Sequence, residues 1–217
     1  MRHRSNAGHQ PPAPCNHAVH FYDQAYPADA ASDFIAAGLR AGDACVLLLT
    51  APHRRAVEQR LRAQGLRTDA QQGHRGSYRA IDTHQALAAI QVGGRLDLAR
   101  ACELLERLLA PPADGSSARI RAVGDPAPTL LAAGLTQDAI ALEAIVDRLA
   151  AAHGAEVFCA YPIADFCRQG HTGSLFEVCA EHTALAFPDR LWAQGFMPPR
   201  SGATSPAWPA AAGRTRS

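Results

Sequence analysis

Lysine is absent from this sequence, and all 21 basic residues are arginines. Without lysine the protein cannot form a Schiff base, and it lacks the residue that a phosphate-binding loop places on the terminal phosphates of a nucleotide. Twenty acidic residues leave a formal net charge of +1. This balance gives no electrostatic sign of a nucleic acid or an anionic membrane as partner.

Long apolar runs are also missing. No stretch approaches the roughly 20 apolar residues of a membrane-spanning helix, and the polar, proline-rich start contains no apolar signal segment. Among the six cysteines, Cys45 and Cys159 stand inside apolar runs, where a free thiol usually packs as a small hydrophobe. Such cysteines are typical of a reducing compartment, so we expect a cytoplasmic protein that contacts neither membrane nor nucleic acid directly.

The two ends of the chain are rich in proline, glycine and polar residues and show no hydrophobic periodicity. Segments of this composition cannot bury enough apolar surface to fold on their own. We therefore expect flexible tails over 1–15 and 198–217, and a single domain over 16–197.

Within this domain, short apolar runs alternate with helical patterns of hydrophobic residues. The runs predict strands at 17–24, 44–50, 77–82, 119–125 and 156–162. The patterns predict helices at 28–40, 53–65, 97–110 and 137–152, and Gly65 has the place of a glycine that ends a helix. The alternation predicts a three-layer α/β fold with a mostly parallel sheet and helices on both faces.

In open parallel sheets, ligands bind beyond the carboxyl ends of the strands. Polar or aromatic residues end the expected strands here, namely Tyr22, Asp23, Thr50, Asp82, Asp125 and Tyr161. Helix capping is an alternative explanation for Thr50, Asp82 and Asp125, most clearly for Asp125, which precedes a proline. The two tyrosines have no capping role, although a buried tyrosine with one hydrogen bond is common. We expect Tyr22, Asp125 and Tyr161 to surround one crevice.

Four other residues have the types found in zinc sites: Cys167, His171, Cys179 and His182. Their spacing, C-x3-H-x7-C-x2-H, matches no standard zinc module. We interpret them as packing cysteines with polar histidines and expect no metal and no other cofactor. The sequence also lacks G-x-S-x-G, H-E-x-x-H and a G-x-G-x-x-G after a strand, which argues against an enzyme.

Five segments in this order resemble the MEDS domain family, the sensory domains of methanogen and methylotroph regulators. They are "HAVHFYD", "FIAAGLRAGDACVLLLTAPHRRAVEQRLRAQGL", "IRAVGD", "ALEAIVDRLAAAHGAEVFCAYPIADF" and "VCAEH", which together span roughly 16 to 186. The resemblance implies a RecA/KaiC-like fold that has lost its phosphate-binding loop. It also implies a small organic ligand, such as a hydrocarbon derivative, and a signalling partner such as a histidine kinase or an anti-sigma factor.

The family motifs match this sequence at particular positions. The opening motif covers His17, Phe21 and Tyr22, an R-x-x-G element covers Arg121 and Gly124, a C-x-Y-P element covers Cys159, Tyr161 and Pro162, and a closing C-x-x-H covers Cys179 and His182. One departure is Asp125, where the family usually has Glu. Motifs and strand ends together give the candidate ligand-binding residues His17, His20, Tyr22, Asp23, Thr50, Asp125, Tyr161 and His182.

Three functions compete at this point. The first is a non-catalytic sensory domain whose ligand lies at the strand ends. The second is a residual RecA-type enzyme that binds or hydrolyses a nucleotide, and the third is a pure interaction scaffold. The segment "QAYPADAASDFIAAGL" stands where a RecA-type ATPase carries its glycine-rich loop and lysine, and it has neither. This favours the sensory domain.

We accordingly predict no ATP binding. Calorimetric titration with Mg-ATP should show no heat of binding at millimolar concentration, where even a weak site of ~4 kcal/mol would register. Saturable binding in the micromolar range would instead support the residual enzyme.

Overall fold

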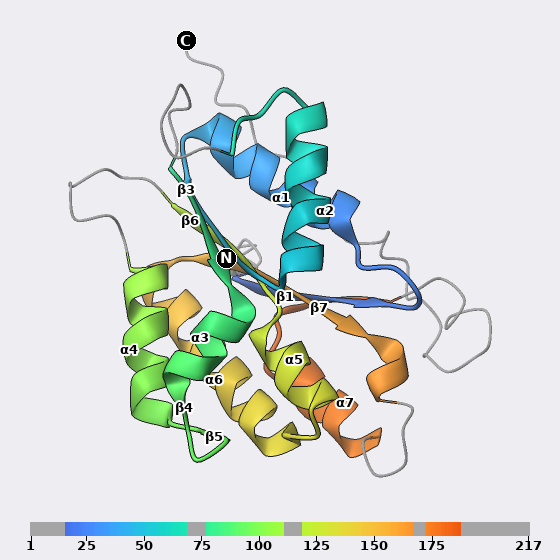
Figure 1. The fold of residues 1–217 in the computed structure, drawn as a ribbon, viewed down its shortest axis with the longest axis vertical. Coiled ribbons are helices and arrows are strands. Elements are labelled where there is room, and N and C mark those ends of the chain that lie inside the picture. The colour runs from blue at the N-terminus through green and yellow to red at the C-terminus, as the bar shows by residue number, and fades with distance from the viewer. Residues whose placement is uncertain (1–15, 69–76, 111–118, 167–171, 188–217) are drawn as a thin grey trace, which may run out of the picture.

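The structure, a computed structural model, describes residues 16–68, 77–110, 119–166 and 172–187. Its centre is one parallel sheet of six strands in the order β3-β2-β6-β7-β1-β8 (Figure 1). These strands are β1 (His17–Tyr22), β2 (Ala44–Leu49), β3 (Tyr78–Asp82), β6 (Ile120–Gly124), β7 (Glu156–Pro162) and β8 (Ala184–Ala186). A separate antiparallel pair, β4 (Gln91–Val92) and β5 (Arg95–Leu96), joins two of the helices.

Helices connect the strands and cover both faces of the sheet. They are α1 (Ala28–Ala41), α2 (Ala51–Ala63), α3 (Thr83–Ile90), α4 (Leu98–Leu109), α5 (Pro126–Ala132), α6 (Thr136–His153) and α7 (Thr172–Ala180), with one 3-10 turn, η1 (Ile163–Asp165). Among the helices of the described segments, none is both long enough and apolar enough to span a membrane.

Side-chain alternation along the strands divides the core into two layers. The helices α1 and α2 cover one face, and α3 to α7 cover the other (Figure 1). Strand β2 contributes Val46 and Leu48 to the α3–α7 side and Cys45 and Leu47 to the α1–α2 side. A strand buried on both faces reads as a continuous apolar run, which is why β2 was recognisable in the sequence. The predicted three-layer α/β fold is confirmed.

All the predicted strands and helices are present, with ends that differ by one or two residues. Gly65 follows the end of α2 with a φ of +75°, the conformation expected of a glycine in that place. Strands β4, β5 and β8 and helices α3, α5 and α7 were not among the predicted elements, because each has too few residues for its hydrophobic pattern to stand out. The tails expected over 1–15 and 198–217, and the end of the expected domain, lie outside the described residues.

Arg121 is a buried charge on the α1–α2 side of the sheet. Its Nε donates to Asp43 Oδ2 at 2.8 Å, and a second nitrogen lies 3.4 Å from Glu156 Oε2. The guanidinium also lies over the ring of Phe34, 5.2 Å from its centroid. Gly38 of α1 makes room for this arrangement, because a Cβ there would lie 2.6 Å from Arg121 Cδ. To make room for a Cβ at position 38, the Arg121 side chain would have to move away and lengthen its contacts with the two carboxylates.

We therefore predict that Gly38→Ala lowers the free energy of unfolding by roughly 1–2 kcal/mol. Crowding in a packed core costs about 1–3 kcal/mol, which exceeds the gain of about 1 kcal/mol from replacing a helical glycine. Gly173→Ala in α7 is the matched control, since its Cβ would meet nothing within 4 Å, and it should leave stability equal or slightly higher. Urea unfolding measures both, and an equal gain in both variants would contradict the prediction.

Candidate functional site

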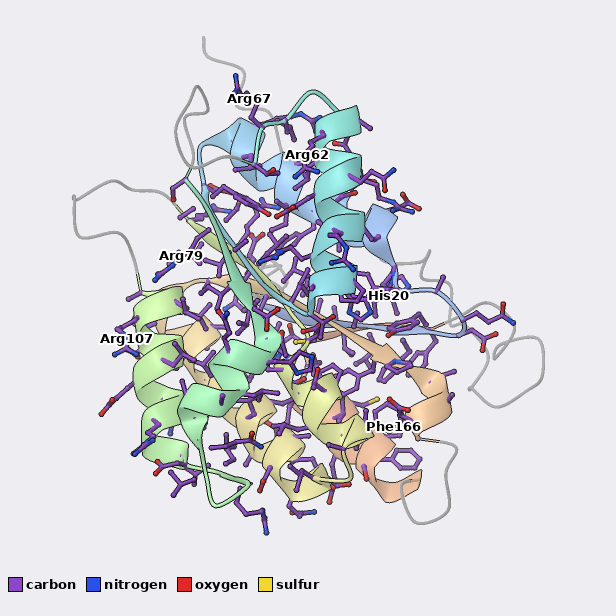
Figure 2. All side chains as sticks on the ribbon, viewed as in Figure 1. His20, Arg62, Arg67, Arg79, Arg107 and Phe166 are labelled. Carbon is purple, nitrogen blue, oxygen red and sulfur yellow. The ribbon has the colours of Figure 1, made fainter. Side chains whose placement is uncertain are left out.

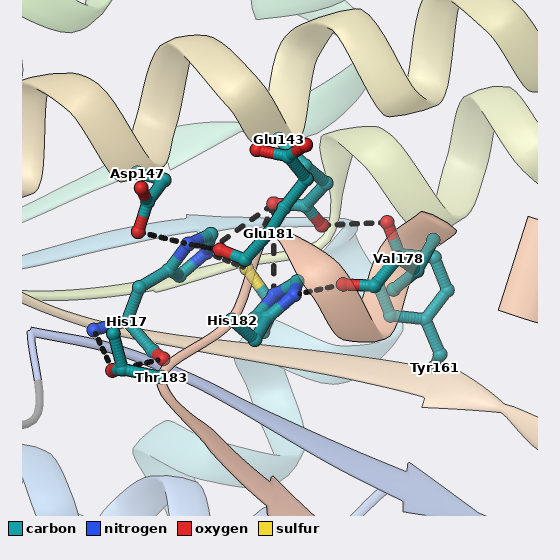
Figure 3. A network of polar contacts seen from close by, with 9 residues as sticks. His17, Glu143, Asp147, Tyr161, Val178, Glu181, His182 and Thr183 are labelled. Atoms are coloured by element: carbon teal, nitrogen blue, oxygen red, sulfur yellow. Dashed lines mark hydrogen bonds and ion pairs between the residues drawn. The ribbon is translucent and has the colours of Figure 1, made fainter. Parts of the chain in front are cut away.

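Five buried polar side chains meet between the sheet and α6 (Figure 3). They are His17 of β1, Glu143 of α6, Cys159 and Tyr161 of β7, and His182, which follows α7. We call this group the Glu143 cluster. The parallel pairing of β1 with β7 brings its strand members together, and their odd numbers turn them toward α6 because side chains alternate along a strand.

Each histidine of the cluster is oriented by a backbone carbonyl. His17 Nδ1 lies 2.9 Å from the carbonyl oxygen of Glu181, and His182 Nδ1 lies 2.7 Å from that of Val178. A carbonyl can only accept, so in a neutral imidazole the proton lies on Nδ1 and Nε2 carries a lone pair. The two rings lie 3.9 Å apart between centroids, and both Nε2 atoms face Glu143.

The carboxylate of Glu143 is the centre of these contacts. Its Oε1 accepts a 2.5 Å hydrogen bond from the Tyr161 hydroxyl. Its Oε2 lies 3.3 Å from His17 Nε2, 3.6 Å from Cys159 Sγ and 3.8 Å from His182 Nε2. His182 Nε2 is buried and has no hydrogen-bond partner among the residues that the structure describes.

Burial and charge act against each other in this cluster. Burial alone would raise the pKa of Glu143, but the neighbouring His182, His17 and Tyr161 outweigh it and lower that pKa to about 2. Burial, reinforced by the negative Glu143, raises the pKa of both Cys159 and Tyr161 well above the usual values. By itself the cluster therefore holds one carboxylate and a neutral thiol.

An apolar cavity of about 50 Å³ adjoins the cluster. Two members of the cluster, Glu143 and Cys159, form part of its wall. The other lining residues are almost all apolar and come from β2, β6, β7, α4, α5 and α6: Val46, Leu48, Leu105, Leu108, Leu109, Ala122, Val123, Gly124, Pro126, Ala127, Pro128, Leu142, Val146 and Val157. A small apolar space with one polar corner is the usual form of a small-molecule site.

A second group surrounds Asp125 at the carboxyl ends of β2 and β6. The Asp125 carboxylate accepts from the Thr50 amide at 3.0 and 3.1 Å, from the Thr50 hydroxyl at 3.0 Å, and from the Thr83 hydroxyl. His53 Nδ1 lies 2.7 Å from its Oδ2. The side chain thus joins the first turns of α2 and α3 to the end of β6.

These contacts show whether Thr50, Asp82 and Asp125 cap the helices that follow them. Asp125 precedes α5, but its side chain makes no capping bond there, so the interpretation as the cap of its own helix is wrong. The Thr50 side chain likewise makes no capping bond to α2. Asp82 does cap α3, accepting from the amides of His84 and Gln85.

The prediction of one crevice around Tyr22, Asp125 and Tyr161 is wrong. Tyr22 packs on the α1–α2 side, whereas Tyr161 belongs to the opposite side and is fully buried. The two tyrosines are on adjacent strands, but the residue of β1 paired with Tyr161 is Phe21 and not Tyr22. Because side chains alternate along a strand, Tyr22 and Tyr161 project from opposite faces of the sheet. Burial, then the charges of Asp125 and Asp165, raise the pKa of Tyr22 to about 12.

Tyr26 occupies the turn between β1 and α1, the place where a glycine-rich loop was considered. Its ring stacks on His53 with 4.0 Å between centroids and meets Tyr22 edge-on at 5.9 Å. Through these rings Tyr22 is linked to the Asp125 group. The candidate residues thus divide between the two groups: Tyr22, Thr50 and Asp125 in one, and His17, Tyr161 and His182 in the other.

The two remaining candidate residues, His20 and Asp23, lie outside both groups. His20 is half-buried on the α1–α2 side, beside Phe158, and burial lowers its pKa (Figure 2). Asp23 is partly exposed in the turn that follows β1.

The zinc spacing considered in the sequence can be followed only in part, because Cys167 and His171 lie outside the described residues. Within the described segments, one group of at least three potential ligands is close enough to share an ion, namely His17, Glu143, Cys159 and His182. It includes His182 but not Cys179.

Glu143 and His53 were missed in the sequence. The signal for Glu143 was a carboxylate on the face of α6 formed by Leu142, Ile145 and Val146, a position that should hold an apolar residue. His53 in the first turn of α2 carried no such signal.

We predict that Asp125→Asn destabilises the protein by about 1–3 kcal/mol, because an amide nitrogen cannot accept from the hydroxyl and amide donors that the carboxylate now satisfies. Asp82→Asn is the matched control and should leave the protein about as stable as the wild type, since Asn caps helices as well as Asp. Thermal unfolding compares the two, and equal tolerance would show that the Asp125 contacts contribute little.

Comparison with known proteins gives a match to one family model. The model of one protein family, described as MEDS, the methanogen/methylotroph DcmR sensory domain, matches residues 16–182. No curated protein and no solved structure matches the chain. The matched segment includes both polar groups and every residue of the cavity wall, and the chain belongs to the MEDS family of sensory domains.

Proposed function

We propose that this sensory domain binds a small, mostly apolar organic molecule, such as a hydrocarbon derivative, in the cavity beside the Glu143 cluster. The observation that carries the proposal is the composition of the cavity wall, which is apolar except for Glu143 and Cys159. A ligand of this class gains free energy from apolar contact and is oriented by the one polar corner.

The size of the cavity narrows the class of ligand. A single water needs about 10–15 Å³ of such space, and a cavity of about 150 Å³ holds benzene. At about 50 Å³, this cavity suits a molecule of a few non-hydrogen atoms. One- and two-carbon alcohols, thiols and halocarbons fall in this range.

We further propose that the domain acts by binding and not by catalysis, in the cytoplasm, and that its partner is a signalling protein such as a histidine kinase or an anti-sigma factor. The Glu143 cluster supplies a route for the signal. Backbone carbonyls at the end of α7 hold both histidines, so a ligand that moves Glu143 changes the contacts of α7. Phe176 of α7 is 72% exposed and gives this helix an apolar contact for a partner.

The prediction is a ligand-dependent rise in thermal stability. A ligand at 100 times its dissociation constant stabilises the folded state by about 2.7 kcal/mol, which corresponds to roughly 5–10 °C for a protein of this size. We expect such a rise with at least one member of a panel of one- and two-carbon alcohols, thiols and halocarbons, and none with benzene.

Ala122→Leu tests the location, because the larger side chain projects from β6 into the cavity. This variant should lose the stabilisation, while Ala99→Leu on the exposed face of α4 should keep it. No rise with any member of the panel, or an equal rise in Ala122→Leu, would refute the proposed site.

A further inference from the structure

We propose that His17, Glu143, Cys159 and His182 form a zinc-binding site. The expectation of no metal in the sequence rested on a different set of residues. Three of the four ligands proposed here, from β1, α6 and β7, lie outside that set. The proposal does not rest on the cavity ligand: it is argued from the donor atoms of the four residues, although Glu143 and Cys159 also form part of the cavity wall.

The spacing of the donor atoms is the first argument. Zinc bonds of about 2.0–2.1 Å to nitrogen or oxygen and about 2.3 Å to sulfur place neighbouring tetrahedral ligands roughly 3.3–3.6 Å apart. His17 Nε2 lies 3.3 Å from Glu143 Oε2 and 3.4 Å from Cys159 Sγ. The distances from Glu143 Oε2 to Cys159 Sγ and to His182 Nε2 are 3.6 and 3.8 Å. All four donors lie within 4.8 Å of one another.

Hydrogen bonding explains these distances less well. Charge-assisted N–H···O bonds measure about 2.7–2.9 Å, and both imidazole–carboxylate separations exceed that range. With their Nδ1 protons directed at carbonyls, His17 and His182 present lone pairs to a carboxylate that also has only lone pairs to offer. His182 Nε2 consequently finds no hydrogen-bond partner within the described part of the chain, although it is buried. A cation between these atoms satisfies all of them.

The surrounding contacts have the form found around metal ligands. A metal-binding histidine usually donates its other ring N–H to a carbonyl or carboxylate, and a ligating carboxylate is itself hydrogen-bonded. Here the carbonyls of Glu181 and Val178 receive the two Nδ1 protons, and the Tyr161 hydroxyl donates to Glu143 Oε1.

Charge and ligand type select the ion. Binding displaces the proton of the Cys159 thiol to solvent, so that one thiolate, one carboxylate and two neutral imidazoles surround a divalent ion with no net charge. This balance suits a fully buried site. Nitrogen and sulfur ligands in a tetrahedral arrangement favour Zn²⁺, whereas Mg²⁺ and Ca²⁺ require oxygen ligands.

The test begins with the full-length wild-type protein. It is unfolded in the presence of EDTA to remove any bound metal. The chelator is then removed, and the protein is refolded with and without zinc. We expect one zinc per chain by elemental analysis and a higher thermal midpoint with the metal, because binding free energy contributes to folding. Refolding with Co²⁺ should give the visible spectrum of a tetrahedral site with a charge-transfer band from a single thiolate.

Variants assign the ligands. Cys159→Ser should lose the charge-transfer band and bind zinc at least tenfold more weakly, whereas Cys179→Ser, which alters the cysteine of the alternative spacing, should behave as the wild type. Tyr161→Phe should keep the stoichiometry and the band but weaken binding about 10–100-fold, as loss of a supporting hydrogen bond does at metal sites. The wild-type spectrum decides the question even if Cys159→Ser does not fold.

Three results would overturn the proposal. They are a thermal midpoint that is the same with and without zinc, a Co²⁺ spectrum without a thiolate band, and loss of binding in Cys179→Ser. The last result would instead assign the metal to the Cys167, His171, Cys179 and His182 set. None of these outcomes depends on whether the cavity binds an organic ligand.

Discussion

The buried carboxylate of Glu143 is the constraint on which the α3–α7 side of the structure depends. An isolated charge costs several kcal/mol to bury, so its position in the core requires partners on every side. Those partners come from β1, β7 and the end of α7, three segments that are far apart in the sequence. Satisfying one charge therefore fixes the position of α6 against the sheet and of α7 against α6.

The other face of the sheet has its own buried charge, Arg121, which is stabilised in a different way. Two carboxylates and an aromatic ring surround the guanidinium, and every one of its neighbours lies within the layer of α1, α2 and the sheet. In this group a cation faces two carboxylates, with a hydrogen bond to Asp43 and an ion pair to Glu156. In the Glu143 cluster, the lone pairs of two neutral imidazoles face a carboxylate oxygen. That contrast is the physical reason to assign a structural role to one group and a binding role to the other.

Much of the fold could be predicted from sequence, because strands such as β2 and β7 are apolar runs and the longer helices repeat their hydrophobic residues regularly. The site was harder. Strand ends were identified correctly, but their grouping failed for Tyr22 and Tyr161, since the parity of a residue in its strand, and not its distance from the end, decides which face it joins. Asp125 was identified correctly as a polar residue at a strand end. The alternative, that it caps the helix after it, failed because its actual donors lie 42 to 75 positions away. Glu143 was the strongest signal overlooked, a charge on an apolar helix face.

The position of His182 connects binding to the edge of the sheet. It lies between the end of α7 and β8, and the neighbouring Thr183 amide donates to the His17 carbonyl at 2.8 Å. Strand β8 has only three residues paired to β1, so its attachment depends heavily on this corner. A change at Glu143 that draws His182 inward, or releases it, acts on the shortest strand of the sheet and on the helix before it. An edge strand with few contacts is the element that responds at the least cost in free energy, and α7 with β8 is accordingly where a change in the buried cluster would first reach the surface.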